Sequence, residues 1–97
     1  MIDYRTEAKI RNIAEIVIPH YGERMQCIVA AEELGELQKE IFKHLRGKDN
    51  KQAIVEEMAD VIIMLCQLKM ITGINSLDIK QEINKKLERQ LKRVKAD

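Results

Sequence analysis

The chain has 97 residues, the length of a single domain over residues 1–97, and 45% of them are apolar and 34% charged. Seventeen basic and sixteen acidic side chains nearly cancel, which argues against duplex nucleic acid as the main ligand. The first ten residues, MIDYRTEAKI, are charged from residue 3, and the longest apolar run covers only residues 61–66, so we expect a cytoplasmic protein without a signal peptide or membrane span.

Apolar residues at helical spacing predict a first helix over residues 3–18. We expect this helix to stop at Pro19, because proline cannot donate the backbone hydrogen bond that continues a helix. The stretch PHYGE would then be a turn. A second helix is predicted over residues 24–45, and its apolar stripe consists of Cys27, Ala30, Leu34, Leu37, Ile41 and Leu45.

A third helix is predicted over residues 51–72. Gly47 would end the second helix, and Asp49 or Asn50 can cap the third. The centre of the third helix, VIIMLCQLKMI, is apolar on nearly every face, as in a helix that is surrounded by others. A β-strand over residues 61–66 is possible locally, but no turn signal separates this run from the helical pattern before it.

The fourth predicted helix begins at Ser76 or Asp78, after a stop at Gly73. One of its faces carries an apolar stripe, which consists of Ile79, Ile83, Leu87, Leu91 and Val94. The neighbouring helices of so short a chain can cover the apolar third helix only partly. We therefore predict an all-α four-helix bundle whose core is completed by dimerisation.

Carboxylates interrupt the second and third helices, in EELGE at residues 32–36 and EEMAD at residues 56–60. A short loop centred near Lys48 should make these helices antiparallel, and Glu36 and Asp60 each lie twelve residues from it, or about 18 Å along the helix. We therefore expect Glu33, Glu36, Glu57 and Asp60 to converge at one level. Neither helix offers a lysine or arginine on the face that these four residues share.

Like charges in a partly dry groove repel one another, so either protons or a cation must neutralise some of them. A site of oxygen ligands alone suits Mg²⁺ or Mn²⁺. The alternative is a rim of solvated acids with ionic partners on the first or fourth helix. A di-iron site is disfavoured, because it requires Glu-x-x-His and neither His20 nor His44 follows a glutamate at that spacing.

The paired motif resembles that of the MazG-type all-α nucleoside triphosphate pyrophosphohydrolases. In this chain it reads E-E-L-G-E at Glu32–Glu36 and E-M-A-D at Glu57–Asp60, and YGERMQ is similar to the Gly-x-x-x-Gln that often precedes it. The resemblance covers about residues 20–93. It implies a four-helix fold, a homodimer or dimer of dimers, and Mg²⁺-dependent hydrolysis of a nucleotide to the monophosphate and pyrophosphate. It implies these metal ligands: Glu33, Glu36, Glu57 and Asp60.

Other residues are candidates for catalysis or substrate binding. Glu32 matches the first glutamate of the motif, and either Glu32 or Glu40 is a catalytic candidate that would orient or activate water. Lys86 and Arg89, on one edge of the fourth helix, are candidates for binding phosphates. The alternative for both is an ordinary basic helix end, which the helix dipole favours. Two residues are candidates for recognising the base: Tyr21 and Gln26.

The sequence leaves the substrate open. Related all-α pyrophosphatases act on dUTP, dCTP or phosphoribosyl-ATP, and the tryptophan that some relatives place near the base is absent here. A second class of function also stays open. A non-enzymatic helical interaction module would use the same apolar stripes for dimerisation and would carry the acids as solubilising charge.

Overall fold

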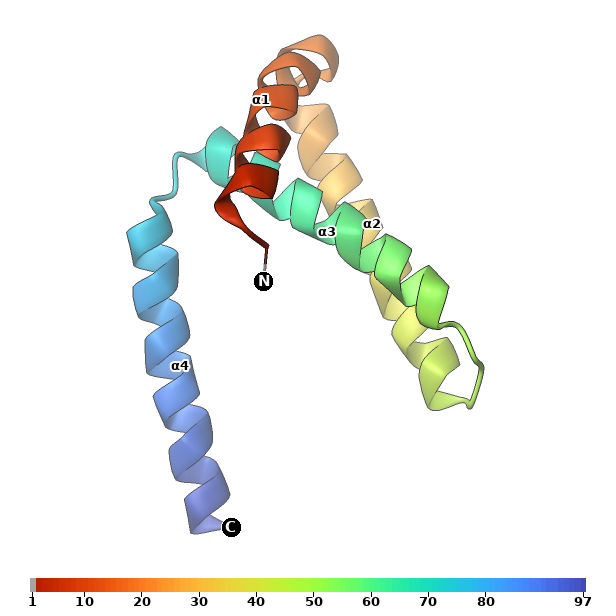
Figure 1. The fold of residues 1–97 in the computed structure, drawn as a ribbon, viewed down its shortest axis with the longest axis vertical. Coiled ribbons are helices and arrows are strands. Elements are labelled where there is room, and N and C mark those ends of the chain that lie inside the picture. The colour runs from red at the N-terminus through yellow and green to blue at the C-terminus, as the bar shows by residue number, and fades with distance from the viewer. Residues whose placement is uncertain (1) are drawn as a thin grey trace.

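The computed structural model describes residues 2–97, and within them the chain is all-α, with four helices and no strands. The helices are α1 (Tyr4–Tyr21), α2 (Glu23–Leu45), α3 (Lys51–Thr72) and α4 (Ser76–Ala96) (Figure 1). The predicted all-α class and the four helices are confirmed, and α3 has the bounds that the sequence predicted. None of these helices is long and apolar enough to span a membrane.

The predicted end of the first helix at Pro19 is wrong. Pro19 lies inside the last turn of α1, and the helix continues past it to Tyr21 although proline cannot donate the backbone hydrogen bond to the carbonyl four residues earlier. The helix ends instead at Gly22, which has a φ of +95° and donates its N–H to the carbonyl of Ile18 at 2.7 Å. Gly22 alone separates α1 from α2, so the stretch PHYGE is mostly helical rather than a turn.

The connection between α2 and α3 folds back along α2. Gly47 has a φ of +90° and bonds to the carbonyl of His44 at 2.9 Å, while the N–H of Lys48 bonds to the carbonyl of Lys43 at 3.1 Å. This pair of bonds is a Schellman motif, which needs a left-handed residue such as glycine at its centre. Because the loop returns along α2, the first residues of α3 lie beside α2 rather than beyond its end.

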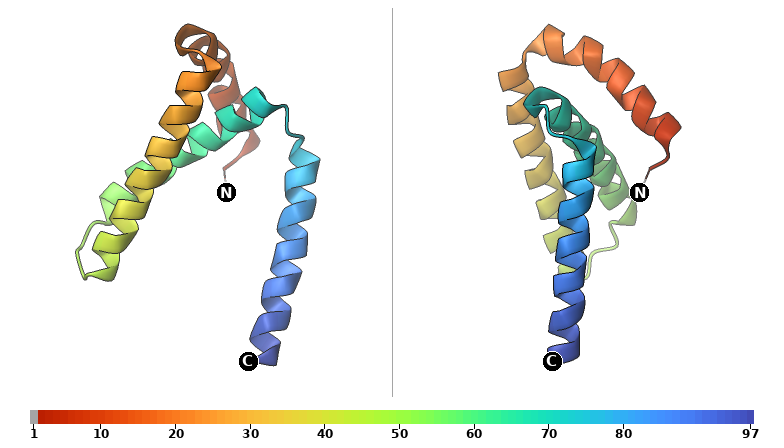
Figure 2. Two further views of the ribbon diagram at one scale, coloured as in Figure 1. Left: turned by 180° about the vertical axis from the view of Figure 1, so that it is seen from behind. Right: turned by 90° about the vertical axis from the view of Figure 1, so that its left-hand side faces the viewer.

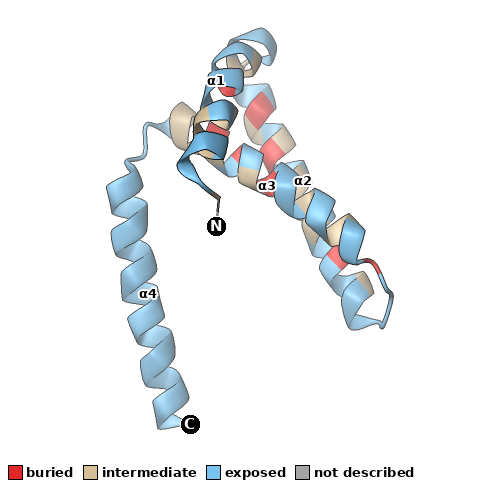
Figure 3. Ribbon diagram, in the orientation of Figure 1, coloured by how far each residue is buried: buried red, intermediate tan, exposed pale blue. Residues whose placement is uncertain are grey.

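Helices α1, α2 and α3 pack against one another, whereas α4 points away from them (Figures 1 and 2). The buried apolar core is small and consists of Ala14, Ala30, Val61 and Met64 (Figure 3). No residue of α4 is buried, and every residue of its apolar stripe is at least 41% exposed. The fourth helix therefore contributes no buried residue to the core that α1, α2 and α3 form within the same chain.

The face of α2 that meets α3 is more polar than the sequence predicted. Its buried residues are Gln26, Ala30 and Glu40, whereas Leu34 and Leu45 of the predicted apolar stripe are 50% and 71% exposed. This rotation of the helix is possible because the inward polar side chains find partners on α3 or in the connection before it. The apolar side of α2 is left facing outward.

Candidate functional site

Three carboxylates meet between α2 and α3. Glu33 comes from α2, and Glu57 and Asp60 come from α3 one turn apart. Each offers one carboxylate oxygen, and these oxygens all lie within 4.8 Å of one another. Glu33 and Glu57 are partly buried and Asp60 is exposed, so the cluster opens to solvent on one side. We call these three residues the carboxylate cluster.

Partial burial and then the crowding of negative charge raise the pKa of two acids in the cluster. Partial burial raises the pKa of Glu33, and the charge of Asp60 raises it further. Burial likewise raises the pKa of Glu57, followed by the charge of Asp60. These shifts mean that the surroundings oppose the charged forms of both glutamates.

The cluster has the chemistry of a site for a hard divalent cation. Its donors are all carboxylate oxygens, which Mg²⁺ and Mn²⁺ prefer. Within residues 2–97, Oε2 of Glu57 is one of two buried side-chain polar atoms without a hydrogen-bond partner. A cation would satisfy this atom and would offset the burial and the repulsion that together raise the pKa of Glu33 and Glu57.

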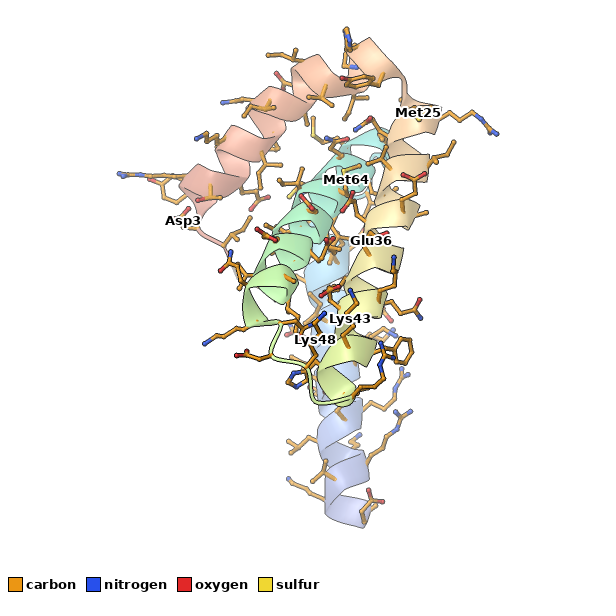
Figure 4. The ribbon with its side chains drawn as sticks, turned by 90° about the vertical axis from the view of Figure 1, so that its right-hand side faces the viewer. Asp3, Met25, Glu36, Lys43, Lys48 and Met64 are labelled. Carbon is orange, nitrogen blue, oxygen red and sulfur yellow. The ribbon has the colours of Figure 1, made fainter. Side chains whose placement is uncertain are left out.

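Glu36, the fourth predicted ligand, lies farther from the cluster. Its carboxylate forms an exposed ion pair with Lys39 at 3.7 Å, and its charge still contributes to the raised pKa of Glu33 and Glu57. Figure 4 shows Glu36 along α2 beyond the turn where Lys43 and Lys48 lie. The expectation that these helices carry no cation beside the acids is therefore wrong for Glu36, because Lys39 reaches it across one turn.

The two catalytic candidates have contrasting surroundings. Glu32 is exposed on α2, next in sequence to Glu33. Glu40 is buried, and its carboxylate accepts hydrogen bonds from Asn50 and from Lys43, both at 3.0 Å. The bond from Asn50 is the main cause of a lowered pKa at Glu40, and the bond from Lys43 adds to it. A carboxylate held in this way is a weak base.

The two candidates for base recognition also differ. Gln26 is buried between α2 and α3, where its Nε2 donates to Oε1 of Gln67 at 2.7 Å. Tyr21, the last residue of α1, is 62% exposed and stacks edge-on against His20 with ring centroids 4.6 Å apart. Tyr21 is therefore open to a ligand, whereas the amide of Gln26 is already engaged within the protein.

Lys86 and Arg89, the phosphate candidates, are exposed on α4. Because α4 points away from the three-helix unit, the chain does not bring these cations to its own carboxylate cluster (Figure 1). The only hydrogen bond between a side chain of α4 and the rest of residues 2–97 joins Ser76 Oγ to Lys69 Nζ at 2.7 Å. The same lysine pairs with Glu7 of α1 at 3.3 Å.

Sequence reasoning missed the roles of Asn50 and Gln67. Asn50 was expected only to cap α3, and it does occupy the N-cap position, but its side chain bonds to Glu40 instead of to the helix. The sequence predicted no role for Gln67, because this residue lies within the apolar run of α3. A polar residue at a buried helical position was the signal that could have identified it.

Comparison with known proteins adds a family to this geometry. The family model described as the MazG-like family matches residues 25–96, well over half of the chain. The matched region includes α3, α4 and all but the first two residues of α2, and it therefore contains the whole carboxylate cluster. No curated protein and no solved structure matches the chain.

Proposed function

The chain belongs to the MazG-like family, and on this premise we propose that it is a Mg²⁺-dependent nucleoside triphosphate pyrophosphohydrolase that releases a nucleoside monophosphate and pyrophosphate. At the coarser level, the family indicates a nucleotide pyrophosphohydrolase. One observation carries the proposal: carboxylates of two facing helices converge within 4.8 Å, and a buried oxygen of Glu57 among them has no partner.

Glu33, Glu57 and Asp60 would hold the cation, and Mn²⁺ would accept the same ligands as Mg²⁺. Glu36 would join them after its exposed pair with Lys39 opens, which costs little because surface ion pairs are weak. When bound, the cation supplies positive charge that attracts phosphate oxygens and activates water for attack. The protein's own part is to hold Glu33, Glu57 and Asp60 at one level of the α2–α3 pair, with Glu36 one turn away.

Glu32 is the better of the two candidates for general base. A base must be accessible to water and must accept a proton near neutral pH. Glu32 is exposed on the helix that carries Glu33. Glu40 is buried and hydrogen-bonded, and its lowered pKa disfavours proton uptake. We therefore assign water activation to Glu32 and remove Glu40 from the catalytic set.

The triphosphate needs cations, and we propose that a second copy of the chain supplies them. Residues 76–96 contain seven basic and three acidic side chains, so α4 is complementary in charge to the carboxylate cluster. Its exposed apolar stripe could pack on the outward apolar residues of another copy's α2 and α3. In such a dimer, or dimer of dimers, Lys86 and Arg89 would face the phosphates of the substrate.

The proposal is tested by metal titration and by product analysis on a panel of nucleotides that includes dUTP, dCTP and phosphoribosyl-ATP. We expect pyrophosphate and a monophosphate in Mg²⁺, and no turnover in EDTA. Glu57→Gln should abolish most turnover, whereas the matched control Glu56→Gln, on an exposed face of the same helix, should retain it. Release of orthophosphate and a diphosphate would contradict the reaction. Absence of metal binding would favour a non-enzymatic interaction module.

A further inference from the structure

All four buried polar side chains within residues 2–97 occur in two hydrogen-bonded pairs between the α2 and α3 sides of the hairpin. Gln26 and Gln67 are 6% and 4% exposed, and Nε2 of the first donates to Oε1 of the second at 2.7 Å. Glu40 and Asn50 are both 9% exposed. Nδ2 of Asn50 donates to Oε1 of Glu40 at 3.0 Å and to its backbone carbonyl at 2.9 Å. We call these pairs the Gln clamp and the Asn clamp.

The two clamps bracket the carboxylate cluster at equal intervals. On α2, both clamp residues lie seven positions from Glu33, one before it and one after it. On the other side, the Asn clamp lies seven positions before Glu57, and the Gln clamp lies seven positions after Asp60. Seven residues make about two helical turns, or about 10.5 Å, and return to nearly the same face. The clamps and the cluster therefore form one polar seam along the α2–α3 contact.

The remaining contacts of this seam do not define its register well. The fully buried apolar residues on these two helices are only Ala30, Val61 and Met64. Apolar burial is non-directional, and methionine adapts its shape easily. Repulsion among the cluster's carboxylates also favours sliding or rotation that would separate them. Something else must hold Glu33 opposite Glu57 and Asp60 before a cation is bound.

Buried amides can supply this specificity because they are costly to leave unpaired. A hydrogen bond adds little net stability, but stranding its buried donor or acceptor costs the full desolvation of that group. A slide of α2 by one turn would strand both clamps at once. Buried polar residues that fix helix register at the expense of stability are known in coiled coils.

We propose that Gln26, Gln67, Glu40 and Asn50 are positioning residues, whose clamps fix the register of α2 against α3 so that the carboxylate cluster can bind its cation. This inference rests on the proposed function for the identity of the cation. It also changes the role of two sequence candidates. Gln26 acts within the protein rather than on the base, and Glu40 acts through Asn50 rather than on water.

The Gln clamp is tested by the double variant Gln26→Met/Gln67→Met in the full chain. Methionine has nearly the length of glutamine, and replacing both partners by apolar groups leaves no unpaired amide, so the variant should melt in EDTA at or above the wild-type temperature. Its affinity for Mn²⁺, measured by titration, should fall about tenfold to a hundredfold, the range seen when residues supporting metal ligands are changed. Gln38→Met/Gln52→Met is the matched control, because both glutamines are exposed on the same helices.

The outcomes separate this inference from the proposed function. If the wild type binds no Mn²⁺, the proposed function fails and the inference fails with it. If the wild type binds Mn²⁺ and the stable double variant binds it equally well, the inference alone fails. A variant that is destabilised and loses binding only in proportion to its unfolded fraction would also overturn the inference, because packing would then explain the result.

The Asn clamp gives a second test that does not depend on an apolar replacement. Asn50→Asp places a carboxylate against Glu40 at the same N-cap position and should weaken Mn²⁺ binding. Glu40→Gln keeps an acceptor for Asn50 and should retain turnover within a few-fold, whereas a catalytic base would lose nearly all of it. The exchange Asn50→Asp/Glu40→Gln restores a donor and an acceptor and should recover part of the binding. Failure of this exchange to recover any binding would count against the clamp.

Discussion

Removing one charge from the carboxylate cluster should stabilise the metal-free protein. The variant Glu33→Gln keeps the shape of the side chain and deletes a charge whose oxygen lies within 4.8 Å of both neighbours. Two unit charges at about this distance repel by roughly 1 kcal/mol even with water-like screening. We expect a gain of about 1 kcal/mol in EDTA, which corresponds to roughly 4–8 °C in melting temperature for a domain of this size.

The same variant should lose the response to metal. A ligand that binds only the folded state at about 100 times its dissociation constant stabilises that state by roughly 2.7 kcal/mol, so Mg²⁺ should raise the melting temperature of the wild type. In Glu33→Gln this rise should shrink, because a ligand and a charge are missing. The assay is thermal unfolding in EDTA and in Mg²⁺, with Glu56→Gln as an exposed control. Strong destabilisation in EDTA, together with a wild type that ignores Mg²⁺, would refute the metal-site reasoning.

Three further predictions follow from the charges and the exposed stripe. Burial and repulsion raise the pKa of Glu33 and Glu57, so the contribution of these two groups to metal-free stability is greatest below their ordinary value of 4.5 and falls as pH rises through the raised values. Unfolding measured as a function of pH should show this contribution in the wild type and not in the double glutamine variant. Lys86→Gln should raise KM for the nucleotide about tenfold in steady-state kinetics, because one charge-assisted hydrogen bond to the substrate is lost. The control Lys95→Gln, near the end of α4, should leave KM unchanged. Leu87→Glu should convert the assembly to a monomer by light scattering without melting α4, and a persistent dimer would disprove its place in the interface.

The helices themselves could be predicted well because their ends depend on local chemistry. Gly73 has a φ of +69° and ends α3 where expected, and Asn75 caps α4 by accepting the N–H of Leu77 at 2.7 Å. Pro19 misled the prediction, because α1 continues past it to Tyr21 despite the backbone hydrogen bond that proline cannot donate. In the last turn of α1, the positive φ of Gly22 decided the boundary instead.

The candidate site could be predicted to within one turn. Counting equal lengths from Lys48 placed Glu36 opposite Asp60, whereas the structure places Glu33 there. The difference arises in the connection, where the Schellman motif turns the chain back so that Asn50 lies level with Glu40. Such a shift depends on backbone hydrogen bonds in a loop, and helical periodicity carries no information about them.

The orientation of α2 and the position of α4 could not be predicted from periodicity, for a shared physical reason. Apolar spacing identifies the face of a helix that is best buried, but not which partner buries it. In α2, Gln26 faces Gln67 of α3 and Glu40 faces Asn50 in the connection, whereas Leu34 and Ile41 turn outward. In α4, the apolar face meets nothing within the described chain.

Helix α2 places polar residues inward and apolar residues outward, and this arrangement links the proposed dimerisation to the carboxylate cluster. A pair of helices that buries glutamines and carboxylates between them gains little from their contact, because paired polar groups contribute far less than buried apolar area. We therefore propose that the burial that stabilises the α2–α3 hairpin comes largely from its outer faces, where Leu34, Ile41 and Leu65 are 50%, 45% and 52% exposed. Covering those faces with the α4 of a second copy would supply that burial and would bring Lys86 to the phosphates in the same step. A hairpin whose stability comes from outside can keep a repulsive carboxylate cluster inside.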